Sequence, residues 1–112
     1  MNSNEENSDY ETTMMRLIAI SGNARSKAFE SIRLAREGNI SNAKKLYEEA
    51  CKELYEAHET QSELIQAEAA GENIPVSLLL IHAQDHLMNA LTVKDLANEI
   101  ILLYEKIRGK DF

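Results

Sequence analysis

Four polar side chains interrupt an apolar run in the stretch LLLIHAQDHLMNA, residues 78–90. They are His82, Asp85, His86 and Asn89. On a helix successive residues are about 100° apart, so all four fall within about 60° of His82 on one face. The same face is apolar before His82 and apolar again from Val93 onward. A simple solvated face does not explain this pattern.

Two histidines four residues apart are compatible with three kinds of chemistry. They can be buried imidazoles whose hydrogen bonds are satisfied by Asp85 and Asn89. They can bind a metal, because His-x-x-x-His places both rings on one face, but a zinc protease of the HExxH form needs a glutamate where this chain has Ala83. A neutral imidazole can also accept a phosphoryl group on a ring nitrogen, with neighbours at i+3 and i+4 assisting. A metal-dependent hydrolase is the least favoured, since the sequence offers no convincing general base.

The elements that must position this cluster are helices. The chain has 112 residues with one proline and four glycines, and helix-forming residues dominate it, which predicts an all-α protein. A first helix is predicted from Tyr10 to the EGN sequence at 37–39, where Gly38 suits a left-handed turn. Asn39 can cap a second helix that Gly71 ends, and Ser77 can cap a third that extends to about Arg108.

Three long helices with short turns predict an antiparallel three-helix bundle. Residues 10–109 are expected to form one domain, preceded by a polar, acidic and disordered leader at residues 1–9. Gly22, inside the first helix, predicts either a kink or a close approach of another helix, and close packing is favoured. The single Cys51 cannot form an internal disulfide and is interpreted as a packing residue, and His58 is interpreted as structural.

Charge and composition exclude some classes of function. Lys and Arg number 12 against 19 Asp and Glu, for a formal net charge of −7, which argues against a nucleic-acid or anionic-membrane binder. The amino terminus has no apolar stretch for a signal peptide, and no run reaches the length of a membrane span. A soluble cytoplasmic protein without direct membrane insertion is therefore expected.

The third predicted helix is apolar on two sides in its amino-terminal half. The side opposite the polar cluster consists of Leu80, Ala83, Leu87 and Leu91. A lone three-helix bundle covers only one of these sides, so we expect copies of the chain to assemble through this helix. If copies of Asp85 meet near a symmetry axis, a cation must relieve their repulsion, and carboxylate oxygens suit Mg²⁺.

Three segments together resemble a known family. VSLLLIHAQDHLMNA, the following VKDLANEIILLYEK and the earlier SGNARSKAFESI closely resemble the enzyme IIA component of the lactose/cellobiose (chitobiose)-type bacterial sugar phosphotransferase system. The resemblance covers nearly the whole chain after the leader. It implies a homotrimer, a nine-helix bundle, in which one histidine accepts a phosphoryl group from phospho-HPr and passes it to a cysteine of the cognate IIB component.

The resemblance also assigns roles to single residues. His82 matches the phosphoryl-accepting histidine, and Asp85 matches the axial aspartate that binds a Mg²⁺ ion shared by the three subunits. His86 matches the second histidine and is expected to support the site. Apart from the resemblance, Gln84 lies about 200° from His82 on the helix, so if it assists, we expect it to do so across a subunit boundary. Lactose, cellobiose, chitobiose and other β-linked oligosaccharides all remain open as the sugar.

A different class of function also fits the residues. In a structural or regulatory helical trimer, the polar cluster would serve only to fix the oligomeric state and register, as buried polar residues do in some assemblies.

Overall fold

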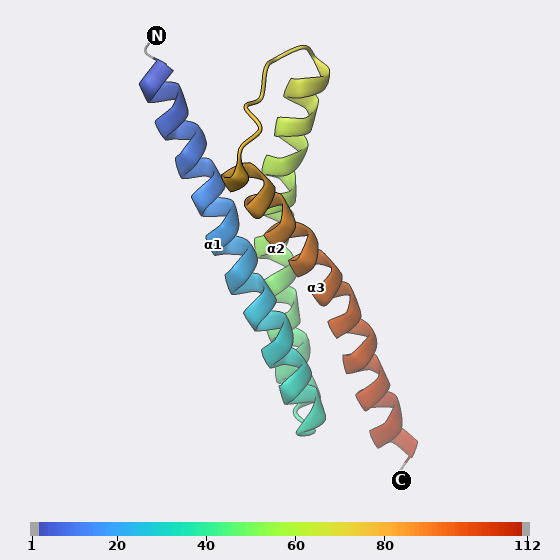
Figure 1. The fold of residues 1–112 in the computed structure, drawn as a ribbon. Coiled ribbons are helices and arrows are strands. Elements are labelled where there is room, and N and C mark those ends of the chain that lie inside the picture. The colour runs from blue at the N-terminus through green and yellow to red at the C-terminus, as the bar shows by residue number, and fades with distance from the viewer. Residues whose placement is uncertain (1–2, 111–112) are drawn as a thin grey trace.

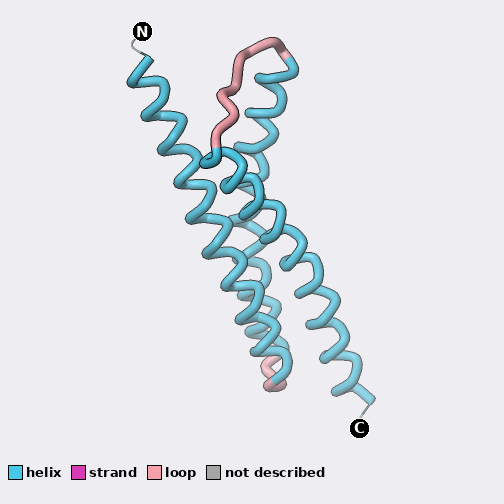
Figure 2. The backbone as a smooth tube through the Cα atoms, viewed as in Figure 1, coloured by secondary structure: helices cyan, strands magenta, loops and turns pink. Residues whose placement is uncertain are grey.

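The computed structural model describes residues 3–110, and these form three α-helices joined by two short connections (Figures 1 and 2). The helices are α1 (Ser3–Arg36), α2 (Ile40–Ala69) and α3 (Leu78–Lys110). α1 and α3 run in the same direction and α2 runs opposite to them, which confirms the predicted all-α, antiparallel three-helix bundle. The molecule is elongated, with extents of 66 × 22 × 19 Å. No helix within the described range is long and apolar enough to cross a membrane.

Glycines end α1 and α2 as the sequence predicts. Gly38 and Gly71 have φ values of +94° and +99°, a conformation that side chains with a Cβ rarely adopt. After α1, the Asn39 N–H donates to the Leu34 carbonyl oxygen at 2.8 Å, and the Gly38 N–H donates to the Ala35 oxygen at 3.0 Å. The same pair of bonds follows α2, so both turns satisfy carbonyls that the helix ends leave free.

The two predicted amino-terminal caps differ in the structure. The Ser77 hydroxyl accepts a hydrogen bond from the Leu80 N–H at 3.1 Å, which fixes the start of α3. Asn39 stands directly before α2 as predicted, but its side chain makes no capping bond. Its backbone carbonyl accepts the Ala43 N–H at 3.0 Å instead.

The start of α1 differs from the sequence prediction. The helix begins at Ser3, so residues 3–9 are helical rather than a disordered leader, while residues 1 and 2 lie outside the described residues. The prediction relied on apolar periodicity, and a helical extension without an apolar stripe leaves no such signal.

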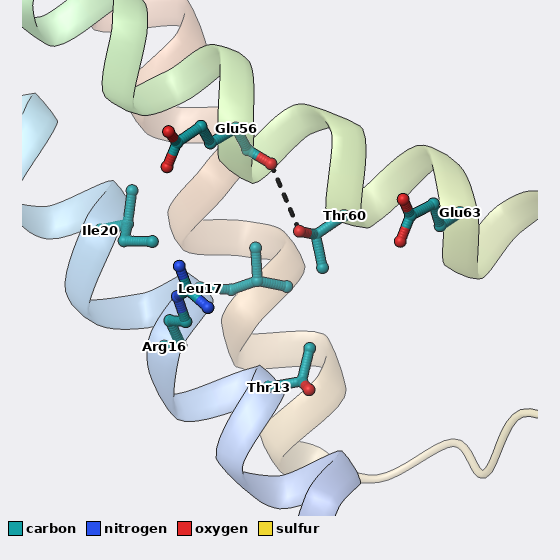
Figure 3. Close-up of a pocket in the computed structure, with 7 residues that line it drawn as sticks. All are labelled: Thr13, Arg16, Leu17, Ile20, Glu56, Thr60 and Glu63. Carbon is teal, nitrogen blue, oxygen red and sulfur yellow. Dashed lines mark hydrogen bonds between the residues drawn. The ribbon is translucent and has the colours of Figure 1, made fainter.

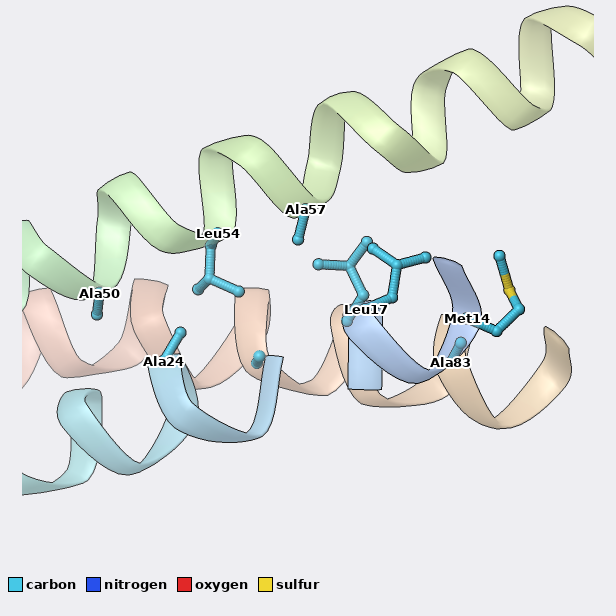
Figure 4. Packing of buried hydrophobic residues seen from close by; sticks show 9 residues of the cluster. Met14, Leu17, Ala24, Ala50, Leu54, Ala57 and Ala83 are labelled. Atoms are coloured by element: carbon cyan, nitrogen blue, oxygen red, sulfur yellow. The ribbon is translucent and has the colours of Figure 1, made fainter. Parts of the chain in front are cut away.

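Small side chains dominate the buried interior (Figure 4). The main cluster draws three residues from each helix: Met14, Leu17, Ala24, Ala50, Leu54, Ala57, Ala83, Leu87 and Ala90. Alanines at the contacts allow helix axes to approach closely, and the few large side chains fill the remaining space. Because Ala83 and Leu87 point into this cluster, the rotation of α3 about its own axis is fixed.

Gly22 lies in the middle of α1 without a close neighbour. A Cβ built at this position would meet no atom within 4 Å. Within the described part of this chain, no other helix therefore packs closely against Gly22, contrary to the prediction.

One side of α3 remains uncovered. Leu78 is 82% exposed, Leu96 57% and Leu103 56%, and all three lie on the side of α3 that faces away from α1 and α2. The sequence predicted that a single bundle would cover only one of the two apolar sides of this helix, and the structure confirms it.

Candidate functional site

His82 and His86 form a contacting pair on the second and third turns of α3. Their Nε2 atoms are 3.1 Å apart, a distance at which one ring donates a hydrogen bond and the other accepts it. The ring centroids are 4.4 Å apart and the ring planes stand at 81° to one another. The ring of His82 is exposed and that of His86 is half-buried, so the pair presents an imidazole to solvent.

This geometry differs from a buried, internally satisfied pair of imidazoles. Asp85 and Asn89 are both exposed, and the hydrogen bond of each ring is made to the other ring. Sequence spacing placed all four residues on one face, and the structure agrees. The interpretation in which Asp85 and Asn89 satisfy two buried histidines is wrong for the single chain.

The register of α3 explains why the two histidines reach the surface. The Ser77 cap sets the start of the helix, and Ala83 and Leu87 are buried in the bundle. His82 and His86 each precede one of these buried residues, which turns them about 100° away from the interior. Upstream, the Tyr10 hydroxyl donates to the Pro75 carbonyl oxygen at 2.9 Å and ties the connection before α3 to α1.

An apolar surface lies beside His82. Leu78, Leu79 and His82 line an open depression of about 450 Å³. The exposed imidazole therefore has apolar side chains next to it on the uncovered side of α3, an arrangement that suits contact with another protein.

Asp85 lies on the same uncovered side. Its side chain is exposed, and its carboxylate makes no hydrogen bond or ion pair with the residues that the structure describes. Residues 3–110 of one chain contain no cluster of three or more His, Cys, Asp or Glu side chains that could hold a metal. A single free carboxylate fits a hard cation such as Mg²⁺ by its oxygen donors, but more ligands must come from other copies.

Gln84 is directed away from the histidine pair, toward α2. Its side-chain oxygen accepts a hydrogen bond from the Gln61 amide. The same Gln61 nitrogen lies 3.6 Å from the Met88 sulfur. Gln84 therefore does not lie next to His82 within one chain. This agrees with their predicted separation of about 200° around the helix.

The pairing of Gln61 with Gln84 is not apparent from the sequence. Gln61 is only 8% exposed and belongs to the otherwise apolar side of α2. A polar residue at such a position signals a buried hydrogen bond, but its partner on another helix cannot be read from spacing along α2.

Two further grooves lie away from the histidine pair. Between α1 and α2, a groove of about 280 Å³ is lined in part by Arg16 of α1 and by Glu56 and Glu63 of α2 (Figure 3). A wider groove of about 580 Å³ between α2 and α3 is lined in part by Cys51 and His58. Cys51 is half-buried and unbridged, in accord with its interpretation as a packing residue.

The fold and the site together define a class: a long three-helix protein with an accessible pair of imidazoles on its third helix. Residues 12–105 match the family model described as "PTS system, Lactose/Cellobiose specific IIA subunit". The chain belongs to this family, which the resemblance of the histidine-bearing segment indicated.

Similar proteins with known roles agree. The chain is 52% identical over 101 residues to the lichenan-specific phosphotransferase enzyme IIA component of Bacillus subtilis, covering 90% of this chain and 92% of that one. It is 38% identical over 104 residues to the N,N'-diacetylchitobiose-specific EIIA component of Escherichia coli K12, covering 93% of this chain and 90% of that one.

Solved structures share the fold. The cellobiose-specific enzyme IIA of Bacillus anthracis superposes with a TM-score of 0.84 at 50% identity, covering 88% of this chain and 91% of that chain. The IIA of the Escherichia coli IIA(Chitobiose)–HPr complex superposes with a TM-score of 0.76 at 39% identity, covering 88% and 95%. The chain is a IIA component of the lactose/cellobiose/chitobiose class, and hence a component of a sugar phosphotransferase system.

Proposed function

We propose that this chain is a phosphocarrier that accepts a phosphoryl group from phospho-HPr on His82 and passes it to a cysteine of the cognate IIB component. The transfer serves uptake of a β-linked disaccharide of the lactose, cellobiose or chitobiose class, and it takes place in the cytoplasm. The single observation that carries the proposal is the exposed His82 ring paired with a second imidazole at 3.1 Å. The relative solved with HPr supports the choice of donor.

The transfer has two halves. In the first, the lone pair of a His82 ring nitrogen forms a bond to phosphorus, while the bond from phosphorus to the donor breaks and its electron pair stays with the donor. In the second, the thiolate sulfur of the IIB cysteine attacks phosphorus, and the nitrogen–phosphorus electron pair returns to the ring. A neutral imidazole suits both halves, because it is a nucleophile near neutral pH and a competent leaving group.

His86 supports the reacting ring. Its Nε2 lies within hydrogen-bond distance of the Nε2 of His82, so it can orient that ring before transfer. After transfer, a protonated His86 nitrogen is close enough to donate to a phosphoryl oxygen and offset its negative charge.

The active unit we propose is a homotrimer. The exposed apolar side chains of α3 are the surface that copies would bury against one another. Gln84 lies on the α2 side of its own α3, away from its own His82, so its amide would serve the His82 of a neighbouring copy. The Gln61 hydrogen bond would hold the Gln84 side chain in place for that role.

Asp85 is the residue that would hold Mg²⁺ in this trimer. Three copies of its unpaired carboxylate near one axis would supply oxygen donors, which a hard divalent cation prefers. The ion, when bound, neutralises repulsion between the carboxylates and so stabilises the assembly.

The overall charge suits the proposed donor. The net charge of −7 gives the surface a negative potential, which attracts a partner with a basic docking surface. Electrostatic attraction of this kind raises the rate of encounter without requiring tight binding, as a carrier that must release its partner needs.

Incubation with phospho-HPr tests the proposal. The wild-type chain should gain one acid-labile phosphoryl group by intact-mass measurement, and should lose it again when the cognate IIB component is added. His82→Ala should show no gain, while His58→Ala, which changes an exposed histidine on α2, should gain as the wild type does. The absence of a gain in the wild type, or an equal gain in His82→Ala, would overturn the proposal.

A further inference from the structure

We propose that His82 and His86 together form a binding site for a divalent transition-metal ion such as Zn²⁺, and that the metal-bound chain cannot accept a phosphoryl group. This site is separate from any Mg²⁺ held by copies of Asp85. The metal binding depends only on the geometry of the two rings, whereas its effect on phosphorylation rests on the proposed function.

The separation of the two nitrogens matches a shared metal ion. Zn²⁺ binds imidazole nitrogen at about 2.0–2.1 Å, so two nitrogens on one ion with a bond angle of 90–110° lie about 2.9–3.4 Å apart. The Nε2 atoms of His82 and His86 are 3.1 Å apart. An ion between the rings would therefore require no change in the backbone of α3.

The chemical state of the pair also permits chelation. The contact between the two Nε2 atoms places one proton between them, and a metal ion replaces that shared proton as the link. The donating ring moves its proton to Nδ1 and so remains neutral, and each Nε2 atom then has a lone pair available to the ion. No other hydrogen bond of the described residues must be broken.

Access and ligand type favour a transition metal here. His82 is exposed, so a hydrated ion can reach the pair from solvent and keep water in its remaining coordination positions. Imidazole suits zinc, copper and nickel, whereas the carboxylate of Asp85 suits magnesium. On one face of α3, the two imidazoles would thus bind a transition metal, whereas the Asp85 carboxylate would bind magnesium.

Bound metal would block the proposed reaction directly. The ion occupies the lone pair of the His82 Nε2 while Nδ1 carries the ring proton, so neither nitrogen can attack phosphorus. The ion also holds His86, the residue proposed to assist transfer. With only two protein ligands the binding is reversible, so the phosphocarrier would be inhibited when free transition metal rises and restored when it falls.

Titration of the full-length chain with Zn²⁺ in a buffer that contains Mg²⁺ tests the binding. Isothermal calorimetry should show a Zn²⁺ site whose affinity falls at least about tenfold in His82→Ala and in His86→Ala. Loss of a residue that only supports a metal ligand already lowers metal affinity by about this factor. His58→Ala and Cys51→Ser should keep the wild-type affinity. Circular dichroism should show unchanged helix content in all four variants.

Equal affinity in His82→Ala, His86→Ala and the wild type would overturn the site, as would loss of binding only in Cys51→Ser or His58→Ala. Imidazole nitrogen NMR of the wild-type chain gives a check without mutation. Zn²⁺ should shift the Nε2 signals of His82 and His86 and leave those of His58 in place, and the reverse pattern would contradict the proposal.

A second measurement tests inhibition separately. The chain is loaded with Zn²⁺, freed of excess metal and mixed with phospho-HPr, and phosphorylation should be blocked until a chelator is added. Normal phosphorylation of the loaded chain would refute the inhibition. A chain that binds Zn²⁺ through the two histidines but is never phosphorylated, even without metal, would instead show that the proposed function is wrong and the metal site right.

Discussion

His82 and His86 illustrate what spacing along a helix can and cannot tell. Their separation of four residues predicts that they share one face of α3, and the structure places them in contact at 3.1 Å. The spacing does not decide which neighbour each ring bonds, because side-chain rotamers depend on tertiary surroundings. The partly buried hydrogen bond from Gln61 to Gln84 cannot be read from spacing either, because it joins two different helices.

Replacing His86 by alanine should slow phosphorylation without abolishing it. The variant keeps the nucleophile but loses the neighbouring imidazole that orients the ring and can donate to a phosphoryl oxygen. Loss of one donor to developing charge typically costs about 10²–10³-fold in rate. Single-turnover measurements with phospho-HPr should show this fall, with His58→Ala at the wild-type rate. A wild-type rate in His86→Ala would remove its proposed role.

Removal of divalent cations should act through Asp85. We expect EDTA to lower the thermal unfolding midpoint of the wild-type chain, because repulsion between the unpaired carboxylates of neighbouring copies is no longer neutralised. In Asp85→Asn the charge is absent, so EDTA should leave the midpoint unchanged. Equal sensitivity of the two proteins in differential scanning calorimetry would rule out Asp85 as the metal ligand.

At the level of the helices, local signals predicted the glycine-terminated ends of α1 and α2 and the start of α3, but not the start of α1. Gly38 and Gly71 mark helix ends because a left-handed residue after a helix is usually glycine, and Ser77 marks a helix start because its hydroxyl can accept a backbone N–H. The start of α1 at Ser3 has no comparable signal. Helix boundaries that depend on the chemistry of one residue can therefore be predicted from the sequence. A helical extension without an apolar stripe cannot.

Gly38→Ala should destabilise the chain. With φ at +94°, an alanine at this position is forced into a left-handed conformation that costs about 1–2 kcal/mol, and its Cβ also meets the Arg108 guanidinium, which must shift. Gly22→Ala is the matched control inside α1, where a Cβ meets no atom within 4 Å and helix propensity improves.

Urea unfolding followed by circular dichroism should give a lower free energy of unfolding for Gly38→Ala and no loss for Gly22→Ala. Equal destabilisation of both variants would show that left-handed strain does not make Gly38 more sensitive to alanine than Gly22. It would also show that another copy of the chain packs closely at Gly22.

For the molecule as a whole, the uncovered side of α3 is the main consequence of building a bundle from only three helices. The sequence predicted this surface, because the amino-terminal half of α3 is apolar on two sides and a single bundle covers one. The arrangement of the copies could not be predicted in the same way, since it depends on how whole surfaces fit together. Leu96 and Leu103, each more than half exposed, mark where that contact is expected.

Leu96→Glu should dissociate the proposed trimer. Each buried leucine contributes about 1.5–3 kcal/mol, and three added carboxylates would also repel one another at the shared surface. Sedimentation equilibrium should give the trimer mass for the wild type and a monomer for the variant. Tyr55→Glu, at a position of α2 that is 66% exposed, should remain trimeric. A monomeric wild type, or a trimeric Leu96→Glu, would contradict the assembly.

Locating the phosphoryl group on the wild-type chain shows directly whether His82 is the residue that accepts it. After reaction with phospho-HPr, digestion and peptide mass spectrometry at alkaline pH, which preserves phosphohistidine, identify the modified residue. The phosphoryl group should reside on His82 alone. A phosphoryl group found on His86 or His58 instead, with His82 unmodified, would contradict it.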